Sequence, residues 1–262
     1  MAAPPNPAVL VCHRGAREVT RVELSRVGCP PPQGRWRPVP HAQVLGYAEQ
    51  ALTAAGYALE KESLALSKDN ARFFGTLTLR TPVAHGVNLA VGLRSSTDKS
   101  ISLQWCCGSR VFVCDNLAFS AQTVVARKHT TYGIDRYQEA ICKVVGELTD
   151  YREYEAFRVR QMRARPVTDE QAESVLCRAF ELGIIGPAAL PVAIREWRTP
   201  SFPEFAEEGQ TAWRLYNALT FALGKRAKTN PQAHAHATIR LGSLVLPDTS
   251  RPALPSSEAA TV

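Results

Sequence analysis

The spacing of apolar positions changes twice along the chain, and each change predicts a different kind of element. Residues 41–55 carry apolar side chains at every third or fourth position, which predicts a helix that Gly56 ends. From residue 57 the spacing becomes two, which predicts strands over YALEKESLAL, FFGTLTLRT, VNLAVGLRSS and SISLQWCCGS, with a β pattern continuing over residues 111–114. The turns between these patterns are short, whereas parallel crossovers need roughly a dozen residues. The pattern therefore favours an antiparallel meander.

Helical spacing returns after the sheet. One long helix is expected from residue 136 to Pro166, and Thr168 with Gln171 forms a capping box for the next. Further helices are expected over 168–183, 188–197 and 211–224. This order predicts an α+β fold, in which a curved antiparallel β-meander (about 57–125) is covered by helices and followed by a C-terminal helical half (about 136–225).

The two ends of the chain differ in composition from this middle part. Residues 1–40 hold eight prolines and six arginines, so a flexible Pro/Arg-rich arm is expected there. Residues 247–262 are rich in proline and serine, and a disordered tail is expected. A single α+β domain should then occupy residues 41–246.

Length and composition exclude several classes of protein. The chain has 262 residues, of which 45% are hydrophobic, yet no apolar run reaches the ~18 residues of a membrane span. The first residues lack the features of a signal peptide, so a cytoplasmic location without membrane contact is expected. Seven cysteines without a CxxC pair favour small buried thiols over a disulfide framework or a zinc site, and no cofactor or metal is indicated. The net charge of +7 favours a phosphate-rich partner.

One strand–turn–strand stretch, GLRSSTDKSISLQWCCGSRVFVCDNLAFS, combines apolar strands with many polar groups. Its turn should bring Arg94, Asp98 and Lys99 to one end of the sheet, among hydroxyls and amide groups that suit a phosphate oxygen. The alternative is an ordinary polar hairpin in which Asp98 accepts hydrogen bonds from its own turn.

Further cations extend this candidate nucleic-acid site. Arg127 and Lys128 follow the predicted sheet. Arg158, Arg160 and Arg163 lie in the second half of the predicted long helix. Cations near the end of a helix also complement its dipole, which requires no ligand. Phe73 and Phe74 are adjacent on a strand and must point to opposite faces, so one of them is a candidate for stacking on a base.

The sequence contains no complete set of catalytic residues. The phosphate-binding, dinucleotide-binding and nucleophile-elbow patterns are absent from the sequence. A metal-dependent nuclease acting near Asp98, Asp115 and His129 stays open as an alternative. A protein-binding anti-defence module around Trp197 and Trp213 is a second alternative.

Several blocks of the sequence resemble a known family. GYALEKESLALSKDNARFFGTLTL, GLRSSTDKS, GSRVFVCDNLAFSA, VVARKHT and TAWRLYNALT are similar, in this order, to the signature blocks of the phage- and plasmid-associated proteins of domain-of-unknown-function family 932. The resemblance covers about residues 40–225 and implies a role in DNA replication, recombination or defence, and no catalytic residues can be carried over from the family. The order of elements after LGYAEQALTAAGYALEKESLALS also resembles Rad52-type single-strand annealing proteins, by topology alone.

These observations together predict a non-enzymatic, mobile-element-type nucleic-acid-binding protein that favours single-stranded DNA. A role as an annealing or recombination accessory factor is expected, with a homo-oligomer as the expected assembly.

Overall fold

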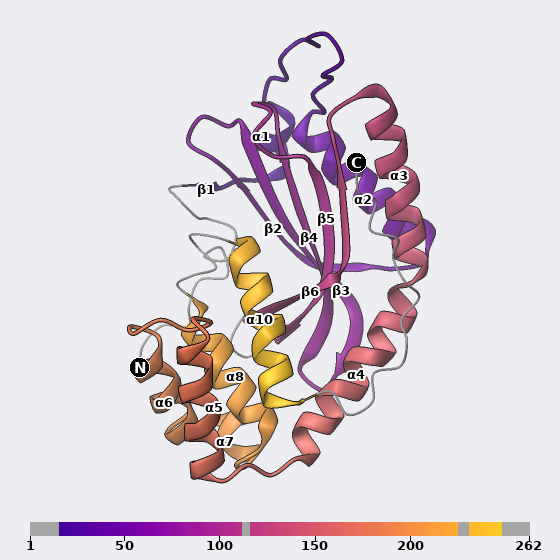
Figure 1. Ribbon diagram of the computed structural model, residues 1–262. Coiled ribbons are helices and arrows are strands. Elements are labelled where there is room, and N and C mark those ends of the chain that lie inside the picture. The colour runs from indigo at the N-terminus through magenta and orange to yellow at the C-terminus, as the bar shows by residue number, and fades with distance from the viewer. Residues whose placement is uncertain (1–15, 112–115, 225–230, 248–262) are drawn as a thin grey trace.

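The computed structural model describes residues 16–111, 116–224 and 231–247. Its strands form one sheet, and most of its helices belong to the second half of the chain (Figure 1). In chain order the elements are β1 (Arg17–Glu18), α1 (Arg21–Ser25), α2 (His41–Ala54), β2 (Leu59–Leu66), β3 (Arg72–Ala84), β4 (Val87–Ser96), β5 (Leu103–Val111), β6 (Asn116–Arg127), α3 (Thr131–Gly146), α4 (Leu148–Ala164), α5 (Asp169–Glu181), α6 (Leu190–Arg198), α7 (Pro203–Glu207), α8 (Ala212–Ala222) and α10 (Pro231–Val245).

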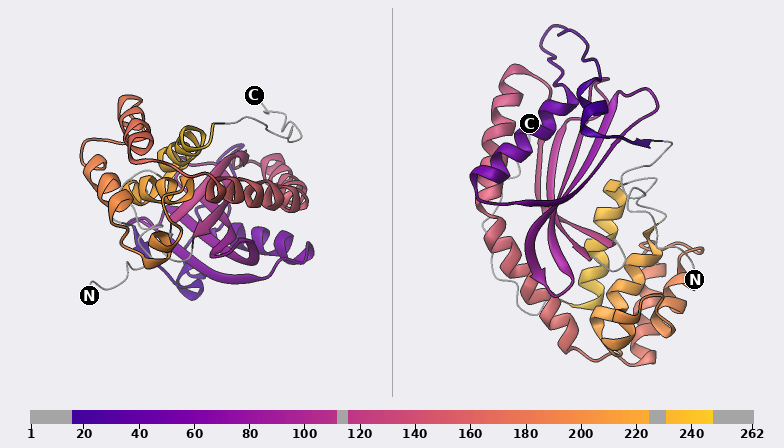
Figure 2. Two further views of the ribbon diagram at one scale, coloured as in Figure 1. Left: turned by 90° about the horizontal axis from the view of Figure 1, so that it is seen from below. Right: turned by 180° about the vertical axis from the view of Figure 1, so that it is seen from behind.

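The sheet is an antiparallel meander of six strands in the order β1-β2-β3-β4-β5-β6. Each strand pairs with its neighbour in sequence, which confirms the predicted topology and the α+β class. Figure 1 and Figure 2 show that the long strands twist strongly along their length. The helices α3 and α4 run alongside the sheet, while α5–α8 gather at one of its ends (Figure 1).

The core lies on one face of the sheet, because alternate strand residues are apolar. Phe73, Leu77, Val91 and Leu93 are fully or almost fully buried there, and so is Trp105, which confirms the core position expected of that indole. The apolar stripes of α2, α3 and α4 pack in the same cluster. Burial of this continuous apolar surface is the main source of stability for the fold.

The prediction of a flexible arm over residues 1–40 is wrong for residues 16–40. Here β1 pairs with β2, and Val19, Leu24 and Val39 are buried in the core. A capping box between Thr20 and Glu23 starts α1, and this local signal was hidden among the prolines. Residues 1–15 lie outside the described part of the chain.

The helical half also differs from the expectation in detail. The single long helix is two helices, α3 and α4, which meet at Glu147. The capping box of Thr168 and Gln171 is confirmed at the start of α5. The helix α10 was not predicted, and the tail expected over 247–262 falls outside the described residues except for Pro247. Among the helices that the structure describes, none is both long and apolar enough to cross a membrane.

Candidate nucleic-acid interface

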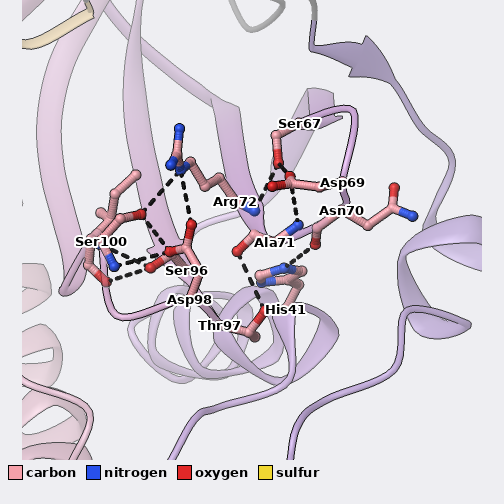
Figure 3. A network of polar contacts seen from close by, with 11 residues as sticks. His41, Ser67, Asp69, Asn70, Ala71, Arg72, Ser96, Thr97, Asp98 and Ser100 are labelled. Carbon is pink, nitrogen blue, oxygen red and sulfur yellow. Dashed lines mark hydrogen bonds and ion pairs between the residues drawn. The ribbon is translucent and has the colours of Figure 1, made fainter.

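The turn between β4 and β5 is held together by Asp98. Its carboxylate accepts hydrogen bonds from the Ser100 amide (2.9 Å) and the Ser100 hydroxyl, and it pairs with Arg72 Nε at 3.2 Å (Figure 3). Partial desolvation raises the pKa of Asp98, but the bonds from Ser100 and Ser96 and the charge of Arg72 outweigh it and lower the pKa to about 2. Asp98 therefore bonds its own turn, as the polar-hairpin alternative predicts.

The neighbouring turn between β2 and β3 is organised in the same way and anchors α2. Asp69 accepts a hydrogen bond from the Ala71 amide at 3.1 Å, and Asn70 adopts a left-handed backbone with φ of 56°. The carbonyl of Asn70 lies 3.0 Å from Nε2 of His41, the first residue of α2 (Figure 3). Burial lowers the pKa of His41, so its neutral ring links the helix to the end of the sheet.

The segment before α2 crosses the same end of the sheet. Gln33 and Trp36 form an isolated β-bridge, and Lys99 Nζ donates to Gln33 Oε1 at 2.8 Å while it lies 4.8 Å from the centre of the Trp36 ring. A few residues on, the Arg37 amide donates to the His129 carbonyl at 2.7 Å. This segment thus joins the β4–β5 turn to the residues that follow β6.

These contacts bring cations from three distant segments to one end of the sheet. Arg35, Arg37, Lys99 and Lys128 are exposed, and Arg127 is half-buried. Within the described ranges, none of the five lies within 4 Å of an acidic side chain. We call these five residues the cationic end. In Figure 1 the loop before α2 lies at the opposite end of the sheet from α5–α8.

Arg94 lies on the sheet face opposite the core. It pairs across the sheet with Phe74 and Gln104, and its guanidinium carbon is 5.7 Å from the centre of the Phe74 ring. Partial burial lowers the pKa of Arg94, and its buried Nε finds no hydrogen-bond partner among the described residues. Arg94 is therefore a partly desolvated cation without a described counter-ion.

Phe73 and Phe74 do point to opposite faces of β3, but neither offers a stacking surface. Phe73 is 0% exposed in the core, where its ring stacks on His41. Phe74 is 5% exposed and packs with Ala65 and Ile101. A base could reach neither ring in this conformation, because both are covered by their neighbours.

The cations of α4 have a different environment from those of the cationic end. Arg158 pairs with Glu155 at 2.7 Å, and Arg163 pairs with Glu208 at 2.9 Å. Desolvation lowers the pKa of Arg158, but the Glu155 carboxylate outweighs this and raises it. Arg160, in contrast, is exposed. Two of the three α4 cations predicted to bind nucleic acid are thus neutralised by acids and stabilise the helical half.

The residues of the nuclease alternative are only partly described. His129 is buried, its Nε2 lies 3.4 Å from the Ser95 hydroxyl, and burial lowers its pKa. Asp115 lies outside the described residues, and Asp98 is engaged by its own turn and Arg72. Across the described residues, no group of three or more His, Cys, Asp or Glu side chains is placed to hold a metal ion.

The two tryptophans of the protein-binding alternative are both buried in the helical half. The indole of Trp197 donates to Asp169 at 2.8 Å, and its ring lies 5.4 Å from the guanidinium carbon of Arg214. The Arg163 guanidinium carbon lies 5.5 Å from the centre of the Trp213 ring. These tryptophans fix the packing between helices and present little surface to a partner.

A cleft of about 570 Å³ opens beside the polar turns. It is lined by side chains of both signs from the N-terminal segment and the two turns: Arg17, Glu23, Arg26, Asp69, Asn70 and Thr97. Because Arg17 also pairs with Glu23 at 3.0 Å, the cleft is less cationic than the surface formed by Arg35, Arg37 and Lys128.

The sequence model of one family matches residues 32–245 and is described as a domain of unknown function, DUF932. The chain belongs to the DUF932 family. The match confirms the family resemblance of the sequence blocks and extends it at both ends. No curated protein and no solved structure matches the chain.

The DUF932 region begins at Pro32, so it contains the whole cationic end but neither β1 nor α1. Sequence reasoning identified Lys99, Arg127 and Lys128 of this surface and missed Arg35 and Arg37, which were assigned to the flexible arm. The signal that could have found them is Gly34 beside Trp36, because a glycine turn next to a large aromatic indicates a segment that folds back on the domain.

Proposed function

We propose that this DUF932 protein binds single-stranded DNA at the cationic end of its sheet and acts as an annealing or recombination accessory factor. One observation carries the proposal: cations from residues 35–37, 99 and 127–128 gather at one place without an acidic partner among the described residues. Like charges held together repel one another, and a polyanion relieves that repulsion.

The residue types favour contacts to phosphate over readout of base edges. Arg35 and Arg37 carry planar guanidinium groups that can bind phosphate in a bidentate manner, while Lys99 and Lys128 act as point charges. These contacts are insensitive to sequence, because every nucleotide has the same phosphate. Arg94, partly desolvated on the adjacent sheet face, would accept a further phosphate and so extend the path along the strand.

The role in recombination rests only on the resemblance of the sequence blocks to phage- and plasmid-associated proteins. An annealing factor neutralises two complementary strands, and a surface that binds backbones without reading bases suits that task. Its activity would appear as faster annealing of two complementary oligonucleotides at a sub-stoichiometric concentration of protein.

Fluorescence anisotropy with a labelled dT30 oligonucleotide tests the binding. If about four or five phosphates are contacted, log K should fall against log salt with a slope of about −3, so affinity drops about 60-fold between 50 and 200 mM salt. The double variant Arg37→Ala/Lys128→Ala should bind more weakly and show a slope shallower by about 1.4. The matched control is Arg178→Ala/Arg195→Ala, which removes the same charge from α5 and α6 at the other end of the protein and should leave the slope unchanged.

Two results would overturn the proposal. The first is no binding of dT30 at 50 mM salt, or binding that salt does not weaken. The second is an equal loss of affinity in both double variants, because net charge rather than the cationic end would then explain the interaction.

A further inference from the structure

Among the described residues, Tyr132 is the most exposed large hydrophobic or aromatic side chain, at 77%. It occupies the first turn of α3, directly after the residues that follow β6. The fold gives this ring no packing role, since the buried face of α3 is formed by Tyr137, Ile141 and Val145. A single exposed aromatic ring is common on protein surfaces, so the role of Tyr132 depends on what lies beside it.

The backbone around Tyr132 is tightly built and places it beside the cationic end. The Thr130 amide donates to the Lys128 carbonyl at 2.9 Å, and the Thr130 hydroxyl accepts from the Gly133 amide at 3.0 Å as the helix cap. A Cβ atom on Gly133 would lie 2.1 Å from the Lys128 carbonyl oxygen, so only glycine allows this approach. The ring of Tyr132 thus rises from a rigid helix start that touches Lys128.

Two cations lie beside this turn, and the exposed acid Asp135 follows Tyr132 by three residues in α3. The carbonyl of the adjoining residue His129 accepts a hydrogen bond from the Arg37 amide. The backbone of Arg37 and that of Lys128 therefore both lie next to the segment that carries Tyr132. An aromatic ring next to groups that bind phosphate is the combination with which proteins hold single strands, because bases stack on the ring while the backbone follows the charge. The capped helix start holds the backbone that carries the ring, so only the side chain has to be ordered when a base stacks on it.

We infer that Tyr132 is a base-stacking residue for the strand whose phosphates the cationic end binds; this inference rests on the proposed function. Two other exposed aromatic side chains, Phe157 and Phe180, belong to α4 and α5 and not to the segments that form the cationic end. Trp36 is close to the cationic end, but Lys99 already lies over its ring. Tyr132 therefore takes the role that the sequence assigned to Phe73 or Phe74.

The experiment compares two probes of equal length and charge: a labelled dT20 oligonucleotide and its fully abasic counterpart, at 50 mM salt. Wild-type protein should bind dT20 more tightly than the abasic strand. Tyr132→Ala should weaken dT20 binding by about 5- to 100-fold, leave the abasic strand within about 2-fold, and keep the salt slope unchanged. Tyr132→Phe keeps the ring and should stay within about 2-fold of wild type for both probes. Phe180→Ala on α5 is the matched control and should change neither affinity.

Each other outcome overturns one specific claim. If wild type binds both strands equally and Tyr132→Ala binds dT20 normally, the stacking inference is wrong while the phosphate-binding proposal stands. If Tyr132→Ala weakens both probes alike, Tyr132 acts through the phosphate contacts and is not a stacking residue. If wild type binds neither probe, the proposed function fails together with the inference.

Discussion

Replacing Gly133 with alanine should destabilise the protein, although helix propensity alone predicts the opposite. Gly133 occupies the third residue of α3, and alanine in a helix is usually favoured over glycine by about 1 kcal/mol. Here the added Cβ would lie 2.1 Å from the Lys128 carbonyl oxygen and 2.8 Å from the Thr130 hydroxyl. The nearest atom belongs to the backbone, so a side-chain rotation cannot relieve the overlap.

The size of the effect follows from this distance. Real Cβ atoms essentially never approach another heavy atom closer than 3.0 Å, so the helix start and residue 128 must separate by roughly 1 Å. Overpacking that requires a backbone shift costs about 1–3 kcal/mol, and the capping bond of Thr130 is strained in addition. After the gain in propensity is subtracted, we expect a net loss of about 1–2 kcal/mol. For a domain of this size the midpoint of thermal unfolding should fall by about 2–8 °C.

Urea and thermal unfolding of the purified variant measure this loss, and Gly146→Ala provides the matched control. Gly146 is the last residue of α3, and its added Cβ would meet nothing within 4 Å, so alanine should be neutral or stabilise by up to about 1 kcal/mol. A Gly133→Ala protein as stable as wild type would refute the close approach of residue 128 to the helix. The same variant should bind dT30 more weakly, because the shift separates Lys128 from Tyr132.

Two further predictions concern charged groups inside the fold. The Asp98 carboxyl has a pKa of about 2, below its ordinary 3.8, so its contribution is present above about pH 4 and is lost as the pH falls through 2. After discounting for its exposure we expect about 1 kcal/mol, which Asp98→Asn should lose at pH 7 but not at pH 2, as urea midpoints at both pH values would test. Glu155→Gln should cost about 3 kcal/mol in urea unfolding at pH 7, because it leaves the charge of Arg158 mostly buried without its partner. A loss below about 0.5 kcal/mol would show that solvent already screens that pair.

Local sequence signals predicted the sheet well because large apolar residues alternate with small or polar ones along β4 and β5, although β3 and β4 are buried on both faces over much of their length. The turns at Asp69 and Asp98 carry residues that suit tight turns. The sequence does not predict the break between α3 and α4, because it is a single residue, Glu147, that itself keeps a right-handed backbone (φ −86°, ψ −3°). Proline density misled the interpretation of residues 16–40, since proline excludes regular pairing at its own position but does not prevent a segment from packing.

The candidate site was only partly predictable, because the sequence pattern places cations along the chain but does not show which of them are paired with acids. Lys99, Arg127 and Lys128 flank strands, so a meander places them at its ends, and the sequence pattern is sufficient to see this. Whether a cation is neutralised depends on contacts that periodicity does not encode. Arg163 meets Glu208, which caps the C-terminus of α7, and no local pattern indicates this contact.

Which cations are paired with acids therefore says more about where a polyanion could bind than the net charge of +7 does. Where a cation supports the fold, an acid accompanies it: Arg21 has Glu49 and Glu62, and Arg72 has Asp98. Such pairs remove charge from the field that a distant polyanion experiences, however basic the segment looks in sequence. Among the described residues, no acid forms an ion pair with a cation of the cationic end, so these cations can still attract a ligand of opposite charge. The location of unpaired cations, rather than their total number, is the reason why we propose this end of the sheet as a nucleic-acid-binding surface.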